Sequence, residues 1–341
     1  PPCSSRRRHT RCCSWSRGLG DVYKRQGPCH PDRQLHILPP METGGLDHEK
    51  FSFKELFFLD ESDRSGIKSK KADGVNAVLE PHQIYYGAGY ARGLKPTFFL
   101  AEVDNKVRSN GYHVYTLGRE LARDLLTIPA MSQNGSVFLR QEAANLFLWD
   151  QISYIKKSGR PALLFALEHL GIAAKEPAAL RQHLPEIFAA VRDIYIYHEL
   201  GEIRDTTFDR GSWREMVAAF PFSPVEFIAR ALKDLLADTG RFGTLHHIIK
   251  ERHTAGLAFY VAFIDGLTKE FFPQIRSAFE AFVESEDWHL IERAVADGYQ
   301  TAKNHTVLVQ DIYREGVKKD NLPWAEAEIQ KRILGNCIHK P

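Results

Sequence analysis

The sequence has no long apolar run. Among its 341 residues, no stretch of about 18 consecutive apolar residues occurs, and a membrane-spanning helix needs roughly that length. No apolar segment follows the arginines near the N-terminus either, so a secretory signal peptide is not expected. The sequence therefore predicts a protein without a membrane partner.

Cysteine is scarce beyond the first forty residues. Four of the five cysteines lie within residues 1–40, and only Cys337 follows them. A single thiol excludes a disulfide framework for the rest of the chain and is typical of a reducing compartment, so we expect a cytoplasmic location. Zinc binding by Cys12, Cys13 and Cys29 is disfavoured, because two adjacent cysteines and a long gap fit no common ligand spacing.

Residues 1–40 differ from the rest of the chain. They show no helical or strand periodicity, and the stretch GLGDVYKRQ at residues 18–26 resembles a translated sequencing adapter. We interpret residues 1–40 as a non-native or disordered extension and expect Met41 to be the start. They hold eight Lys and Arg against two Asp and Glu, which leaves 37 basic and 41 acidic residues in 41–341. The net charge of +2 becomes −4, so no nucleic-acid partner is expected.

Several catalytic motifs are also missing. No serine or cysteine lies in a recognisable nucleophile elbow. The glycines of GAGYARG, residues 87–93, lack the strand and helix that flank a phosphate-binding loop, so we interpret them as a tight turn. These absences leave the common nucleotide-binding and serine hydrolase classes without support.

The arrangement of apolar residues predicts the fold. Aromatic and β-branched residues in 97–103 and 112–117, with Asn110 and Gly111 between them, indicate a small β-hairpin. From Gly118 onward the periodicity is helical. We expect helices at 119–128, 136–157, 160–170, 176–205 (split or kinked at Pro185), 222–240, 244–269, 274–284, 287–315 and 323–334.

The fold prediction is therefore a mainly α protein, an irregular helical bundle with a small β-hairpin element near residues 97–117. Residues 81–341 are expected to form a single, mainly helical domain. Residues 41–80, with a short apolar patch and a charged loop, are expected to pack loosely on it as an N-terminal segment.

The stretch IYIYHELGEIRD, residues 194–205, is the best candidate for chemistry. Its HELGE segment is one residue away from the zinc-hydrolase pattern H-E-x-x-H, with Glu202 in place of the second histidine. In that pattern His198 and Glu202 would bind the metal ion from one helical face, and Glu199 would activate water as the catalytic residue. A third ligand would come from His246, His247 or Glu251.

A second interpretation uses two helices. His247 and Glu251 repeat the i, i+4 spacing of His198 and Glu202, so the two pairs together could hold Fe or Zn in a helical bundle. Glu142 and Asp205 are the candidates for additional carboxylate ligands. The competing explanation is that these are His–Glu pairs on solvated helix faces, which stabilise a helix without binding anything.

Two classes of function remain open. The first is a metal-dependent oxidoreductase or hydrolase that acts on a small molecule or a protein. The second is a non-catalytic helical binding or scaffold protein. Convergence of His198, Glu202, His247 and Glu251 in the folded chain would favour the first class.

Overall fold

The computed structural model describes residues 69–173 and 177–338, all of which lie within the unit Leu56–Pro341. The predictions for residues 1–40 and for 41–68 fall outside the described residues. The described remainder of the N-terminal segment is the helix α3, Ser69–Leu79. This helix packs against strand β1, Ile84–Tyr90, and Asn76 bonds through its side chain to both the backbone N–H and the carbonyl of Tyr86 at 2.7 and 2.9 Å.

A five-stranded curled sheet occupies the first part of the described chain. After β1 it contains β2 (Pro96–Ser109), β3 (Tyr112–Arg123), β4 (Ala130–Gln133) and β5 (Ser136–Arg140). The strand order is β1-β2-β3-β5-β4, with β3 and β5 parallel and all other neighbours antiparallel. The prediction of a mainly α bundle with only a small hairpin near residues 97–117 was therefore wrong.

Two features of the sequence prevented a correct prediction of this sheet: glycines within a strand, and apolar runs too short to distinguish a strand from a helix. Gly87 lies inside β1 rather than in a turn, and a Cβ there would come within 2.2 Å of Cε1 of Phe99 on β2. The glycine thus lets the fully buried Phe99 ring pack directly against the neighbouring strand. Residues 119–123 and 136–140, predicted as helix, belong to β3 and β5, because strand pairing decides what a short apolar run leaves ambiguous.

The turn at Asn110 and Gly111 connects β2 with β3. The two residues have φ angles of 50° and 87°, which is the left-handed conformation that a two-residue hairpin turn requires. The hairpin is longer than predicted, since β2 and β3 pair from Ser109 and Tyr112 as far as Phe99 and Arg123.

Helices make up the rest of the described chain. They are α4 (Gln141–Ser153), α5 (Arg160–His169), α6 (Pro177–Leu180), α7 (Leu184–Arg204), α8 (Arg210–Ala219), α9 (Pro224–Thr239), α10 (Thr244–Lys250), α11 (Thr254–Phe263), α12 (Gly266–Phe271), α13 (Gln274–Ser285), α14 (Trp288–Lys318) and α15 (Leu322–Ile338). Short 3-10 turns lie at Glu80–His82, Arg92–Leu94 and Arg181–His183.

Two predicted helices have different boundaries in the structure. Pro185 lies in the first turn of α7 and starts that helix, because a proline at this position has no N–H that the helix would otherwise leave unpaired. The predicted helix 244–269 is divided into α10, α11 and α12, with Arg252 and Gly266 at φ angles of 50° and 59°. Arg252 follows the end of α10, and Gly266 is the first residue of α12, so each lets the chain change direction between two helices.

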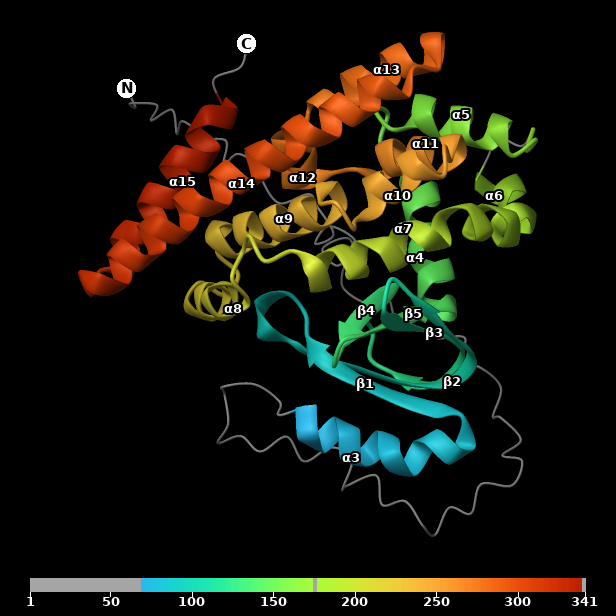
Figure 1. Ribbon diagram of the computed structural model, residues 1–341, viewed down its shortest axis with the longest axis horizontal. Helices are drawn as coiled ribbons and strands as arrows, with labels where there is room; N and C mark the ends of the chain where they lie inside the picture. Colours follow the sequence, from blue (N-terminus) through green and yellow to red (C-terminus); the bar gives the residue numbers. More distant parts are fainter. Residues whose placement is uncertain (1–68, 174–176, 339–341) are drawn as a thin grey trace, which may run out of the picture. The chain divides into compact units, whose positions relative to one another are not determined.

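Helix α7 is central to the candidate site. It contacts β4 and β5 of the sheet as well as α9 and α10 (Figure 1). A Cβ at Gly201 of α7 would lie 2.2 Å from the carbonyl oxygen of Ala237 on α9, so this glycine allows the two helices to approach closely. The approach brings the polar side chains of α7 next to those of α9.

Candidate functional site

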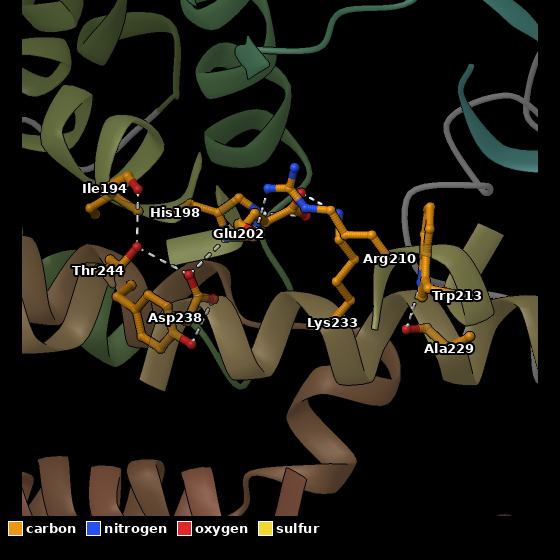
Figure 2. A network of polar contacts seen from close by, with 10 residues as sticks. Ile194, His198, Glu202, Arg210, Trp213, Ala229, Lys233, Asp238 and Thr244 are labelled. Atoms are coloured by element: carbon orange, nitrogen blue, oxygen red, sulfur yellow. Dashed lines mark hydrogen bonds and ion pairs between the residues drawn. The ribbon is translucent and has the colours of Figure 1, made fainter. Parts of the chain in front are cut away.

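A network of polar side chains joins α7 to α9. Figure 2 shows His198 and Glu202, one turn apart on α7, facing Asp238 and Lys233 of α9. The surrounding residues of α9 are buried and apolar, among them Leu235, Leu236 and Ala237. Because polar groups are costly to bury without partners, a charged cluster at this position requires an explanation.

Asp238 fixes the orientation of the His198 ring. Its Oδ1 lies 2.9 Å from Nδ1 of His198. Asp238 is held in turn by Thr244 of α10, which lies 3.0 Å from Oδ1, and by Tyr260 of α11, which donates to Oδ2 at 3.1 Å. With Nδ1 committed to a carboxylate, Nε2 of His198 points to the other side of the ring. A carboxylate that holds one ring nitrogen while the other binds a metal ion is a common arrangement in metalloproteins.

Glu202 lies on that other side of the ring. Its Oε1 is 3.7 Å from Nε2 of His198, while its Oε2 accepts a hydrogen bond from Lys233. The two oxygens of Glu202 therefore have different environments, one facing the histidine and one facing a cation. Arg210 of α8 donates to the backbone carbonyls of Glu202 and Ile203 at 3.4 and 3.1 Å. It thereby pairs two carbonyl groups that the C-terminal end of α7 would otherwise leave without a hydrogen bond.

Asp234 completes the group. It lies one turn before Asp238 on α9, and one oxygen of its carboxyl, Nε2 or Nδ1 of His198 and one oxygen of Glu202 all lie within 4.8 Å of one another. Within residues 69–173 and 177–338, the Asp234 carboxyl forms no hydrogen bond or ion pair. A small cavity of about 10 Å³, enough for roughly one water molecule, lies beside the group and is lined by Glu202, Lys233, Asp205 and Arg210.

The charges of the group are unequal. Burial raises the pKa of Glu199 to about 7, with the nearby Glu202 acting in the same direction, and burial raises that of Asp234 to about 6. Burial opposes ionisation of Glu202 as well, but Lys233 and His198 outweigh it and lower the pKa of Glu202 to about 2. Burial likewise opposes the charged form of His198, yet Asp238 and Glu202 raise its pKa well above the usual value.

Four carboxyl groups thus face two cations. Glu202 and Asp238 are paired with Lys233 and His198, whereas Glu199 and Asp234 are the groups whose ionisation is suppressed. Ser132 of β4 lies close enough to Glu199 to lower its pKa, against the effect of burial. A bound divalent cation would balance two carboxylates that otherwise remain protonated or destabilising.

The other predicted ligands lie apart from this group. The His247 ring stacks on Tyr197, with centroids 3.6 Å apart, and its Nε2 is 3.5 Å from Asp193. Glu251 follows the end of α10, is half exposed and pairs with its neighbour Lys250 at 3.2 Å. The structure therefore brings His198 and Glu202 together with Asp234, not with His247 and Glu251.

Glu142 and Asp205 have structural partners. Oε2 of Glu142 accepts from the backbone N–H of Glu120 on β3 at 3.0 Å. Asp205 follows α7 and accepts from the Thr207 backbone at 2.8 Å and from the Tyr299 hydroxyl at 3.0 Å. Asp205 nevertheless borders the small cavity beside Glu202.

Sequence reasoning missed the ligands and partners that α9 contributes. Asp234 and Asp238 stand at i, i+4 in the segment ALKDLLADTG, as do His198 and Glu202 on α7. Two aspartates inside an otherwise buried apolar helix were the available signal, since such groups require partners. The same i, i+4 spacing at His247 and Glu251 favoured α10 instead.

Fold and site together define a protein in which a curled mixed sheet is followed by a helical region that carries a polar cluster between two helices. The chain belongs to a family of unknown function, DUF6866. The N-terminal domain of this family matches residues 53–140 of the chain, and the C-terminal domain matches residues 145–332. The boundary between the two matches falls where β5 ends and α4 begins. Neither the curated proteins nor the solved structures include a match to the chain.

The polar cluster belongs to the C-terminal family domain, whereas β4 and β5 belong to the N-terminal one. Because α7 packs on these two strands, the site lies against the sheet of the first domain. None of the helices in the described part of the chain has the length and apolar character needed to cross a membrane.

The pKa of Glu199 makes the stability of the metal-free protein pH-dependent. A carboxyl whose pKa rises from 4.5 to about 7 on folding binds more protons in the native than in the unfolded state between these values, so stability falls as pH rises through them. We expect Glu199→Gln to leave stability nearly unchanged at pH 4 and to raise it at pH 8. The gain is about 1 kcal/mol, less than the full shift implies, because the side chain is partly exposed.

Urea unfolding of both proteins at the two pH values, after removal of metal ions, measures this difference. An equal difference in the free energy of unfolding at pH 4 and pH 8 would contradict the assigned environment of Glu199.

Proposed function

We propose that the protein binds a divalent metal ion, Zn²⁺ or Fe²⁺, through His198, Glu202 and Asp234, and that it is a metal-dependent hydrolase. The observation that carries this proposal is the Asp234 carboxyl, which lies next to His198 and Glu202 without a hydrogen-bond or ion-pair partner among the described residues. One imidazole and two carboxylates form a ligand set that suits these metal ions.

The geometry around the histidine supports the same assignment. Nε2 of His198 and Oε1 of Glu202 are 3.7 Å apart, and two ligand atoms at about 2.1 Å from a tetrahedral zinc ion are separated by roughly 3.4 Å. A small rotation of either side chain therefore suffices. Asp238, Thr244 and Tyr260 supply the supporting hydrogen bonds that hold the ring in place.

The neighbouring carboxyl favours hydrolysis over electron transfer. A metal ion with three protein ligands keeps an open position for water and lowers the pKa of that water. Glu199 follows His198 directly on α7, as the water-activating glutamate does in the H-E-x-x-H pattern. With a metal ion held by His198, Glu202 and Asp234, Glu199 would be the residue that accepts a proton from the attacking water.

One observation favours a second candidate, a non-catalytic protein in which the cluster only stabilises the packing of α7 on α9. Lys233 pairs with Glu202, and Asp238 pairs with His198, so half of the carboxyl groups are compensated without a metal ion. Under this alternative, metal ions change neither the stability nor the behaviour of the protein. The two candidates therefore differ in whether metal ions raise the stability of the protein.

Thermal unfolding with and without metal ions tests the proposal. A ligand that binds only the native state at 100 times its dissociation constant adds about 2.7 kcal/mol, which corresponds to an increase in Tm of about 4 °C for a chain of this size. We expect this increase with Zn²⁺, or with Fe²⁺ under anaerobic conditions. Asp234→Asn should abolish it.

The matched control is Asp150→Asn. Asp150 is also a partly buried aspartate with a pKa raised by burial, but it lies on α4. This variant should keep the full metal-dependent increase. Equal responses of the two variants, or no response of the unmodified protein to either metal ion, would refute the metal site.

A further inference from the structure

A second, larger cavity lies where α7 ends. Its volume is about 150 Å³, and it is bordered by the last turn of α7, the turn between α9 and α10, and Tyr299 of α14. This volume exceeds by roughly tenfold the space that a single water molecule requires. Asp205 borders both this cavity and the smaller one beside Glu202. The large cavity is therefore adjacent to the proposed metal site, but it is lined by different side chains.

Two arginines without acidic partners line the cavity. Neither Arg204 nor Arg241 forms an ion pair within the described residues. The one carboxylate present, Asp205, is occupied by other donors, since it accepts from the Thr207 backbone and from the Tyr299 hydroxyl at 2.8 and 3.0 Å. The cavity therefore has positive charge available for a ligand, and arginine favours carboxylate and phosphate groups.

Arg204 is held in a defined orientation. One Nη donates to the carbonyl of Asn110 in the β2–β3 turn at 2.6 Å, and the guanidinium lies over the rings of Tyr112 and Phe242 at 5.1 and 4.1 Å. Its Nε, in contrast, is buried and has no acceptor among the described residues. An unsatisfied buried donor costs about 1–3 kcal/mol, so Arg204 is held beside the cavity by its Nη hydrogen bond and by the two rings, not through Nε.

Both guanidinium groups lie near the same aromatic ring. Phe242 has 38% of its surface exposed, with Arg204 at 4.1 Å from its ring centroid and Arg241 at 5.6 Å. A partly exposed phenyl ring near two cations offers an apolar surface next to positive charge. A small molecule with an oxyanion and an apolar or aromatic body matches both features.

We propose that this cavity binds a small organic oxyanion, a phosphate ester or a carboxylic acid whose charged group contacts Arg204 and Arg241 and whose apolar part lies against Phe242. The proposal does not depend on metal binding, because none of the three proposed metal ligands lines the cavity.

Calorimetric titration of the full chain after metal removal provides the test. Phenyl phosphate and benzoate are the probes, and benzyl alcohol is the uncharged control. We expect at least one of the two anions to bind with a dissociation constant in the millimolar range or below, and the alcohol not to bind. The stronger of the two anions identifies the ligand as a phosphate ester or as a carboxylic acid.

Two variants locate the binding site. Arg241→Gln changes an exposed residue that forms no ion pair among the described residues, and Arg204→Gln removes the partly exposed guanidinium; each should weaken binding of the anion about tenfold, as expected for the loss of a charge-assisted contact. Arg192→Gln, which changes an exposed arginine elsewhere on α7, should bind as the unmodified protein does. The absence of anion binding at 10 mM (roughly the weakest affinity worth assigning), or equal weakening by Arg192→Gln and Arg241→Gln, would overturn the proposal.

Discussion

Replacing His198 with alanine is expected to lower the affinity of the protein for Zn²⁺ on the order of 100-fold or more. Changes to residues that merely support a metal ligand cost about 10- to 100-fold, and His198 is the only imidazole within the proposed ligand set. The same substitution leaves Asp238 with hydrogen bonds from Thr244 and Tyr260, so the packing of α9 should survive. Competition with a chromogenic zinc chelator measures the change.

His247→Ala is the matched control for this experiment. His247 is likewise a largely buried histidine, with 13% of its side chain exposed, and it carries an acidic neighbour, Asp193. Because it lies outside the proposed ligand set, its removal should change the zinc affinity by no more than about twofold. If His247→Ala weakened zinc binding as strongly as His198→Ala, the ligands would be those first expected from the sequence and not those that the structure brings together.

Replacing Lys233 with methionine is expected to destabilise the metal-free protein and, at the same time, to tighten zinc binding. Lys233 compensates Glu202, and both side chains are mostly buried, with 23% and 16% exposed. Loss of one partner of such a pair leaves the other charge uncompensated and should destabilise the metal-free protein by about 2–3 kcal/mol. Methionine keeps the length of the side chain, so the loss of packing should be small.

Zinc binding should become tighter in the same variant. Lys233 opposes a bound cation through its charge and occupies Oε2 of Glu202, so its removal frees that oxygen and should raise the zinc affinity about tenfold, equivalent to about 1.4 kcal/mol. Saturating zinc would then restore a large part of the lost stability. A purely structural cluster predicts the same destabilisation with no recovery.

Lys250→Met is the control for the lysine experiment. Lys250 is 81% exposed and pairs with Glu251 near the surface, where such pairs contribute little. Its replacement should change the free energy of unfolding by no more than about 0.5 kcal/mol. It should leave the affinity for zinc unchanged. Chemical denaturation and zinc titration of both lysine variants under identical conditions provide the comparison.

The helices of the C-terminal part were predictable because their signals are local. Ser223 accepts a hydrogen bond from Val225 at 3.1 Å and starts α9, and Asp287 accepts from His289 at 2.9 Å and starts α14. Capping side chains and a first-turn proline act within one turn of the chain, so the sequence shows them directly. The same holds for the turn at Asn110 and Gly111.

The sheet was not predictable to the same degree, because its formation depends on contacts distant in sequence. Gly87 makes room for the ring of Phe99, and this function exists only when the two strands have paired and Phe99 lies opposite it. Strand β5 reads as the start of a helix until it pairs in parallel with β3. A parallel pair has no turn signal of its own, and a five-residue apolar run fits either structure.

The candidate site was half predictable for a related reason. His198 and Glu202 share one face of one helix, so their spacing alone places them together. Asp234 comes from another helix, and its distance from His198 depends on the close approach of Gly201 and Ala237. The sequence contains both i, i+4 pairs but does not show which helices are neighbours.

The metal content of the purified chain after equilibrium dialysis tests whether His198, Glu202 and Asp234 bind a metal ion. Dialysis of the unmodified protein and of a variant with alanine at His198, Glu202 and Asp234 against the same micromolar Zn²⁺ solution, followed by elemental analysis, gives the number of ions per chain. We expect about one zinc ion per unmodified chain and less than about one tenth of an ion per variant chain. Equal zinc content in the two proteins, or less than about one tenth of an ion in the unmodified protein, would contradict this expectation.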